Sequence, residues 1–263
     1  MNTFSRNSAI FSTLLARDLK ILKQRLLNLI VDGLIVMFMN VLVFGYLLPL
    51  LGMSTTLIAP IFLGNSLSFF IASLGYNCAI RIVYDLKFNR FIDYLITLPL
   101  PKRWLFTYFI TSFIMESAIV SLPLTTIGIL LLGKNFGPIN GSFIMFLMIY
   151  FLFLLFWALF FLSCSFTYNF IWFRNNMWAR RLMPLFIFGS AFFTFKKVTL
   201  IMPMLRIIML CNPLTYFIEG LRSSLLGGPD YLPLTTCFIG IFISLFFMIL
   251  RLRSGISQQL DPV

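Results

Sequence analysis

The chain has 263 residues, of which 60% are hydrophobic and only 11% are charged. Soluble domains carry about 25% charged residues, so this composition excludes an ordinary soluble protein. The net charge of +12 is spread over short segments that flank apolar runs, which argues against a nucleic-acid-binding face and favours loops beside an anionic lipid leaflet. We therefore expect an integral membrane protein whose partners include the lipid membrane and no nucleic acid.

The apolar runs are much longer than the roughly ten residues of a membrane-spanning strand, and they contain few charges. They predict an all-α membrane protein with six transmembrane helices. The predicted spans are residues 29–50, 57–80, 104–132, 143–166, 182–195 and 234–250. The fifth is the shortest, and its boundaries are the hardest to place.

Residues 1–28 are predicted to form an amphipathic helix that lies in the headgroup plane. Leucines and a phenylalanine occupy one arc, and Arg17 and Lys20 lie opposite. Asp18 falls at the edge of the apolar arc, where an unpaired carboxylate is costly. Arg25, two turns further on, is one candidate partner, and the alternative is a carboxylate that extends into the headgroups.

The segment 81–103 joins the second and third spans and holds seven of the 28 charged residues, so it must lie in water. It predicts a short amphipathic helix over about 84–98, ended by prolines that lack the N–H a helix needs. The apolar stripe is Phe88, Phe91, Ile92 and Leu95, and the other faces carry Lys87, Arg90, Asp93 and Tyr94. This helix either lies along the membrane surface or contacts a soluble partner.

The distribution of basic residues predicts the orientation. With the N-terminus in the cytoplasm, fifteen of the 20 Lys and Arg residues lie on the cytoplasmic side. Both termini and the 81–103 segment are then cytoplasmic. We expect one transmembrane domain over 29–253 and a cytoplasmic tail over 254–263.

Two moderately apolar pieces, 198–210 and 214–226, surround Cys211-Asn212-Pro213. Each is too short to cross about 30 Å of hydrocarbon. They predict two short re-entrant helices within 198–228 that return to the outer face, an arrangement tolerated where protein or a water-filled cavity covers the backbone.

The residues 212–222 predict a capped helix. Asn212 or Thr215 is expected to cap its start, and Glu219 is expected to bond Arg222 one turn later. This pattern is interpreted as a cap-and-turn motif that closes an outer gate. The alternative is direct contact of Tyr216 or Glu219 with a transported substrate.

Polar residues also occur within the spans. Glu116, in the third span, is either a protonatable coupling or cargo-binding group or a paired structural group. Asn40 and Asn65 are interpreted as hydrogen-bonding residues between helices, with cavity lining as the alternative. The four cysteines show no Cys-x-x-Cys spacing and the chain has no histidine, so no metal site is expected.

Three of these segments together resemble one family. The sequence 212–222, Asn-Pro-Leu-Thr-Tyr-Phe-Ile-Glu-Gly-Leu-Arg, followed by a final span, resembles the signature of ABC-2 type transporter permeases. Residues 88–99 are similar to the coupling-helix region of that family, and Arg17-Asp18-Leu19-Lys20 resembles its interface helix.

The resemblance implies a homodimeric or heterodimeric permease that joins two cytoplasmic ABC ATPase subunits and exports a substrate across a bacterial plasma (inner) membrane. The chain has no Gly-x-x-x-x-Gly-Lys-Ser/Thr loop, so ATP and Mg²⁺ are expected on the partner ATPase, and the chain itself is expected to bind no cofactor and to be no enzyme. The implied functional residues form three groups: Phe88, Asn89, Arg90, Phe91, Asp93, Tyr94, Leu98 and Pro99 for ATPase coupling; Arg17, Asp18 and Lys20 for the interface helix; and Asn212, Pro213, Tyr216, Glu219 and Arg222 for the outer gate.

The cargo is only broadly indicated. Spans rich in Phe and Met suit an amphipathic or apolar substrate, such as a drug-like compound or a lipid-linked glycan. A polysaccharide exporter of the same family is a near alternative. A proton-coupled secondary transporter centred on Glu116 is an alternative of another class, and no converging nucleophile, base or metal ligands suggest a membrane enzyme.

Overall fold

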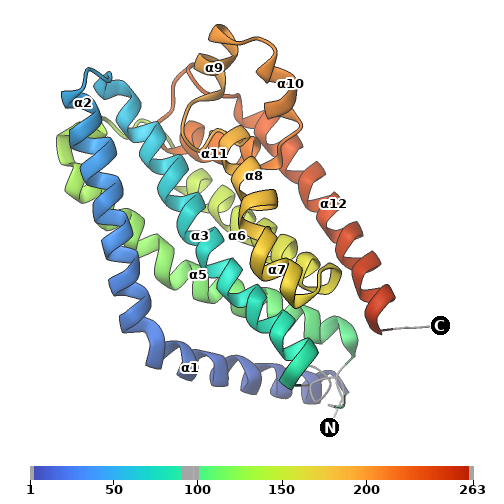
Figure 1. The fold of residues 1–263 in the computed structure, drawn as a ribbon. Coiled ribbons are helices and arrows are strands. Elements are labelled where there is room, and N and C mark those ends of the chain that lie inside the picture. Colours follow the sequence, from blue (N-terminus) through green and yellow to red (C-terminus); the bar gives the residue numbers. More distant parts are fainter. Residues whose placement is uncertain (1–2, 90–96, 98–100, 261–263) are drawn as a thin grey trace.

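The computed structural model describes residues 3–89, 97 and 101–260, and for Thr3, Phe4, Asn89, Lys102 and 256–260 it describes the backbone alone. The predicted coupling residues Arg90, Phe91, Asp93, Tyr94, Leu98 and Pro99 lie outside the described residues. The described part is a bundle of helices without a β-strand (Figure 1). The prediction of an all-α protein is confirmed.

Five long helical segments form most of the bundle. Their elements are α1 (Thr3–Asn40) continued by η1 (Val41–Leu47) and α2 (Leu48–Leu50), α3 (Ile58–Tyr84) between η2 (Thr55–Leu57) and η3 (Asp85–Asn89), α5 (Lys102–Leu132) followed by η4 (Gly133–Phe136), α6 (Phe143–Thr167), and α12 (Leu234–Leu260). Each is long and apolar enough to cross a membrane. The first, second, third, fourth and sixth predicted spans all fall within these segments, so a multi-pass membrane protein is confirmed.

The predicted fifth span differs from the observed helix. The chain is helical from α7 (Phe170–Met177) through η5 (Trp178–Leu182) to α8 (Met183–Phe188), and then turns at Ser190, whose φ is +61°. The helix therefore begins and ends earlier than 182–195. Asn169 explains its start, because its side chain accepts a hydrogen bond of 2.8 Å from the backbone N–H of Trp172.

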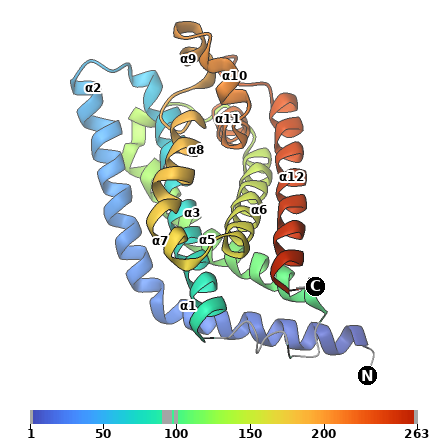
Figure 2. The ribbon, with the colours of Figure 1, turned by 45° about the vertical axis from the view of Figure 1, so that its right-hand side comes forward.

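The segment 195–225 contains three short helices, whereas two were predicted within 198–228. They are α9 (Phe195–Ile201), α10 (Leu205–Leu210) and α11 (Pro213–Leu225). The first predicted piece is divided because Met202 is forced toward extended backbone (φ −131°, ψ 85°) by the following Pro203. In Figures 1 and 2, α9 and α10 lie at the end of the bundle opposite to both chain termini.

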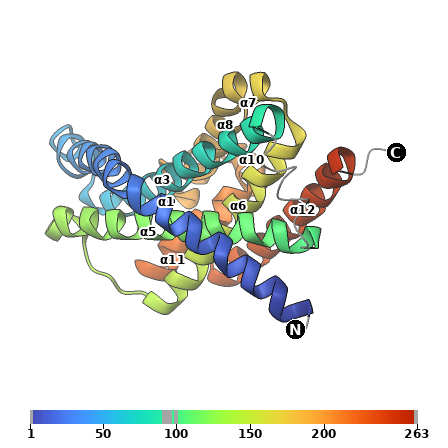
Figure 3. The same ribbon diagram turned by 90° about the horizontal axis from the view of Figure 1, so that it is seen from below.

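The N-terminal helix has two parts. Its first half lies across one end of the bundle, and its second half bends and runs along the bundle (Figures 1 and 3). Phe11, Leu14 and Leu15 of the first half pack against Leu105 and Tyr108 of α5. The apolar arc predicted for 1–28 thus contacts protein on at least part of its length.

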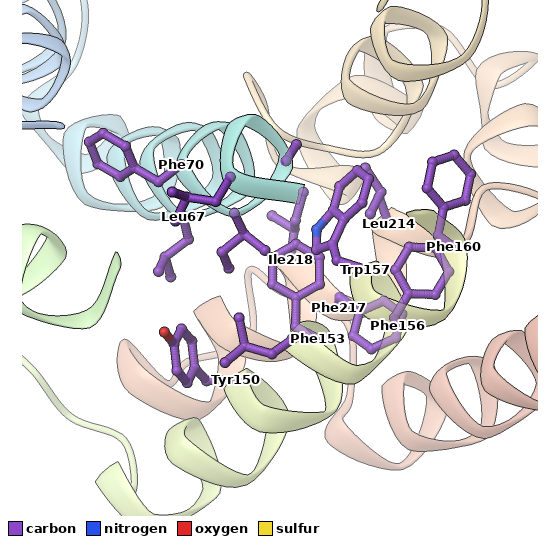
Figure 4. Packing of buried hydrophobic residues seen from close by; sticks show 14 of the residues in the cluster. Leu67, Phe70, Tyr150, Phe153, Phe156, Trp157, Phe160, Leu214, Phe217 and Ile218 are labelled. Atoms are coloured by element: carbon purple, nitrogen blue, oxygen red, sulfur yellow. The ribbon is translucent and has the colours of Figure 1, made fainter. Parts of the chain in front are cut away.

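The core lies between α3, α6 and α11 (Figure 4). Phe217 of α11 packs against Phe153 and Phe156 of α6, with ring centroids 5.3 Å and 4.9 Å apart. Trp157, completely buried, lies beside them. Aromatic packing on α6 therefore fixes the position of α11, which carries the predicted outer-gate residues.

Candidate functional site

Polar side chains gather at the two ends of the bundle. At the end where both termini lie, Arg17 and Asp18 of α1 meet Tyr108 and Ser112 of α5, and we call this cluster the α1–α5 joint. At the opposite end, α11 carries a buried ion pair with its backbone partners, which we call the Glu219–Arg222 network. The two clusters contain the predicted interface-helix and outer-gate residues respectively.

Asp18 is the centre of the α1–α5 joint. Its carboxylate accepts hydrogen bonds from the Tyr108 hydroxyl at 2.5 Å and the Ser112 hydroxyl at 2.8 Å, and it forms an ion pair with Arg17 at 2.9 Å. The Arg17 guanidinium also donates to the Tyr108 oxygen at 2.8 Å. The predicted partner Arg25 was wrong, because Asp18 points toward α5 and finds its partners there.

Arg25 pairs instead with Glu116, one turn beyond Ser112 on α5, with 3.9 Å between Nη2 and Oε1. Tyr108, Ser112 and Glu116 recur every four residues, so they form one polar line on the face of α5 that meets α1. This contact favours the interpretation of Glu116 as a paired structural group.

This line borders a cavity of about 300 Å³ between α1, α3 and α5. Arg81 and Asp85, from the end of α3 and from η3, also contribute to its wall. The N-terminal helix and the chain segment that leads into the predicted coupling helix therefore border the same cavity.

We predict that Glu116→Gln lowers the free energy of unfolding by less than about 1 kcal/mol, because an ion pair that is long, at 3.9 Å, and only partly buried contributes little. The Arg25 and Glu116 side chains are 34% and 17% exposed. Thermal unfolding of the purified variant beside wild type measures this. A loss of several kcal/mol would show that this ion pair stabilises the fold more than its distance and partial exposure indicate.

Asn40 and Asn65 join two helices. The Asn65 side-chain amide donates to Asn40 Oδ1 at 2.6 Å, and Asn40 donates to the backbone oxygen of Val36 at 3.0 Å. This is a hydrogen bond between α1 and α3, as the sequence interpretation favoured.

In the Glu219–Arg222 network, the Arg222 side chain has no solvent exposure. Its Nη1 lies 2.8 Å from Glu219 Oε1 and 2.9 Å from the Phe193 carbonyl oxygen. Its Nε donates to the Pro60 carbonyl at 2.7 Å, and its Nη2 donates to the Ala191 carbonyl at 3.3 Å. One guanidinium therefore connects α11 to the start of α3 and to the loop after α8.

Glu219 completes this network and is equally buried. Its Oε1 accepts the backbone N–H of Phe195 at 3.0 Å, and its Oε2 accepts that of Leu232 at 3.3 Å. The predicted bond from Glu219 to Arg222 is confirmed. Because the carboxylate is enclosed by protein donors, this conformation supports the cap-and-turn interpretation over direct contact of Glu219 with a substrate.

Burial lowers the pKa of the Arg222 guanidinium from its ordinary value, while the adjacent Glu219 carboxylate acts in the opposite direction. Arginine stays protonated at neutral pH in either case. The network is thus a neutralised charge pair whose remaining donors go to backbone carbonyls, the arrangement that a buried pair requires.

The other outer-gate residues surround the start of α11. Asn212 caps the helix, accepting the Leu214 N–H at 3.0 Å, as predicted. Pro213 occupies the first turn, where its missing N–H has no cost. The Tyr216 hydroxyl donates to the Leu210 carbonyl at 2.7 Å and so ties α11 to α10.

The sequence did not reveal Gly64 as part of this network. A Cβ atom there would lie 2.3 Å from Arg222 Nη2 and 2.7 Å from the Ala191 carbonyl oxygen, so only glycine admits the arginine against α3. No local pattern marks such a glycine, because its partner lies far along the chain.

Lys20 is exposed, and so is Phe88, where the second span ends. The Phe88 ring packs against Tyr84, with centroids 4.9 Å apart, and against Phe170 at 5.7 Å. Neither Lys20 nor Phe88 belongs to the α1–α5 joint. Both leave part of their surface open for other contacts.

The profile of a known protein family matches most of the chain. The sequence profile of the ABC-2 type transporter family matches residues 10–226, which include the α1–α5 joint and both members of the Glu219–Arg222 ion pair. Neither the curated proteins nor the solved structures contained a match. The chain belongs to the ABC-2 type transporter family.

Proposed function

We propose that the chain is the permease subunit of an ATP-binding cassette exporter and that a separate subunit hydrolyses ATP. The observation that supports this most is the α1–α5 joint. The first half of α1 lies across one end of the bundle, is bonded to α5 there, and continues into the first span (Figure 1). A partner that moves this half-helix would move two spans together.

We propose six crossings, with α7, η5 and α8 as the fifth. These 19 residues extend about 28 Å at 1.5 Å per residue, close to the roughly 30 Å of a hydrocarbon core. Both termini lie at the same end of the bundle, as an even number of crossings requires (Figure 2). The helices α9 to α11 then form a re-entrant cap at the outer face.

The proposed assembly contains two permease chains, identical or different, and two ATPase subunits that bind ATP and Mg²⁺. It lies in the bacterial plasma (inner) membrane with both termini cytoplasmic, as the excess of Lys and Arg on that side favours. The cargo we propose is an amphipathic or apolar compound, with a polysaccharide as the near alternative.

Co-purification tests the proposed function directly. The tagged chain is isolated from its native membranes in mild detergent, its partners are identified, and ATP hydrolysis is measured with and without it. We expect a stoichiometric ATPase that carries a phosphate-binding loop. A chain that is isolated alone and transports without ATP would instead point to a gradient-driven transporter.

We predict that Arg90→Glu or Asp93→Lys weakens ATPase association at least tenfold, because each reverses a charge on the predicted coupling helix. Retention of the ATPase on the immobilised chain measures this effect. Lys134→Glu is the matched control for Arg90→Glu, since it makes the same charge change in η4, at the other end of the α5 segment. Equal retention in all variants would contradict the coupling assignment of 88–99.

A further inference from the structure

A groove of about 380 Å³ lies between α8 and α12, over the face of α6. Figure 2 shows α8 and α12 on either side of α6. Arg180 and Arg181 of η5 and Arg251 of α12 contribute to its wall, which is otherwise mainly apolar and includes Phe160 and Phe188. The groove is therefore amphipathic, with its cations grouped and its aromatic residues beside them.

The three arginines have no carboxylate among the residues that line this groove. Arg181 Nη2 donates to the Tyr168 hydroxyl at 2.6 Å, and Arg251 Nη2 donates to the same oxygen at 3.4 Å. Two guanidinium groups thus share one neutral acceptor, and the Arg180 side chain makes no hydrogen bond or ion pair with any residue in the described ranges. Like charges placed this closely favour binding of an anion.

The apolar part continues along α12. A second cavity, of about 350 Å³, shares Cys211, Pro213 and Met248 with the groove and extends to Gly240. From Arg251 to Gly240 the helix rises about 16 Å, which is close to half of a hydrocarbon core of about 30 Å. The length of the strip therefore matches the acyl region of one lipid leaflet.

We propose that this groove binds an anionic phospholipid from the leaflet at the end where both termini lie. The phosphate contacts the guanidinium groups of Arg181 and Arg251, which reach the Tyr168 hydroxyl just beyond the end of α6, and that of Arg180 in the same groove. Guanidinium groups bind phosphate oxygens through paired N–H donors. An acyl chain lies on the apolar strip toward Met248 and Gly240. This lipid site is additional to the proposed export function and requires neither the ATPase nor a cargo.

The test uses the purified full-length chain in detergent, with phosphatidylglycerol and phosphatidylcholine added at equal concentration and bound lipid counted by native mass spectrometry. We expect at least tenfold preference for phosphatidylglycerol. The triple variant Arg180→Gln, Arg181→Gln, Arg251→Gln should bind at least tenfold less phosphatidylglycerol than wild type. The control Arg174→Gln, Arg253→Gln removes two exposed arginines from the same stretch of helices outside the groove and should retain this binding; the double variant Arg180→Gln, Arg181→Gln removes the same number of charges from the groove and should not.

Arg180→Gln alone is the second variant, because Arg180 has no protein partner in the described ranges whose loss would impair folding. It should lower phosphatidylglycerol binding severalfold while the thermal unfolding midpoint stays at the wild-type value. Equal binding of the two lipids by wild type, or equal losses in the triple variant and its control, would overturn the proposal. Because the assay omits ATP and ATPase, failure of the export proposal would leave this result unchanged.

Discussion

Arg222→Met is expected to destabilise the folded chain by about 3–5 kcal/mol, the largest stability loss among the substitutions considered. The variant leaves the Glu219 carboxylate, which has no solvent exposure, without its counter-charge. It also leaves the carbonyls of Pro60 and Phe193 without their donor. Thermal unfolding in detergent, followed by size-exclusion chromatography, should show a midpoint lower by on the order of 10 °C.

Two further variants separate the ion pair from a general effect of removing an arginine. Arg206→Met changes an exposed arginine on the neighbouring α10 and should leave the free energy of unfolding within about 0.5 kcal/mol of wild type. The double variant Glu219→Gln, Arg222→Met should be less destabilised than Arg222→Met alone, because no unpaired charge stays buried. If the double variant lost as much as the single one, the backbone contacts of Arg222 and not its charge would hold this end of the bundle.

The local features of this end were predictable because they involve neighbours in sequence. Asn212 caps the helix that it precedes, and Glu219 reaches Arg222 three residues later, distances that any α-helix imposes. The carbonyl acceptors of Arg222 were not predictable in the same way. Pro60 lies 162 residues away, and a backbone carbonyl carries no side-chain signature of its partner.

The membrane spans were likewise predictable in part. Runs of about 20 apolar residues predict crossings because lipid excludes unsatisfied polar groups, and five of the predicted spans fall within observed long helices. The fifth was displaced because Arg180 and Arg181 interrupt the apolar run. In the structure the helix continues through them, and the Arg181 side chain extends to the Tyr168 hydroxyl. Long basic side chains allow such a course, because their charged ends reach away from the helix axis.

The sequence holds a further indication of which residues contact Asp18. Arg25 was one of two possibilities considered, because it follows on the same helix, whereas the observed partners Tyr108 and Ser112 lie about ninety residues away on α5. Tyr108, Ser112 and Glu116, spaced by four residues, are a polar line that a lipid-facing span has no reason to carry. Such a line on one span and a charged edge on the N-terminal helix are complementary, and together they indicate contact.

Asp18→Ala is expected to disconnect the ATPase from the outer end of the bundle, on the basis of the proposed function. The substitution removes the acceptor of four hydrogen bonds, from Arg17, Tyr108 and Ser112. Hydrogen bonds to a charged group contribute about 1.5–3 kcal/mol each when buried, and less at this half-exposed position. The first half of α1 would then move without drawing α5 along.

Cys211 provides the readout, because it is exposed beside the outer-gate residue Asn212 while the other three cysteines are buried or half-buried. Its rate of labelling by a membrane-permeant maleimide is measured in the purified permease–ATPase complex in detergent, without nucleotide and with ADP-vanadate, because Cys211 also borders the apolar cavity beside α12. We expect Asp18→Ala to reduce the nucleotide-dependent difference at least tenfold while ATP hydrolysis and complex yield persist. Asp32→Asn, at an exposed acid on the same helix, should keep the wild-type difference. A purely structural role of Asp18 would lower yield and hydrolysis together, whereas loss of the labelling difference alone identifies the α1–α5 joint as the connection through which movement of the N-terminal helix reaches the outer gate.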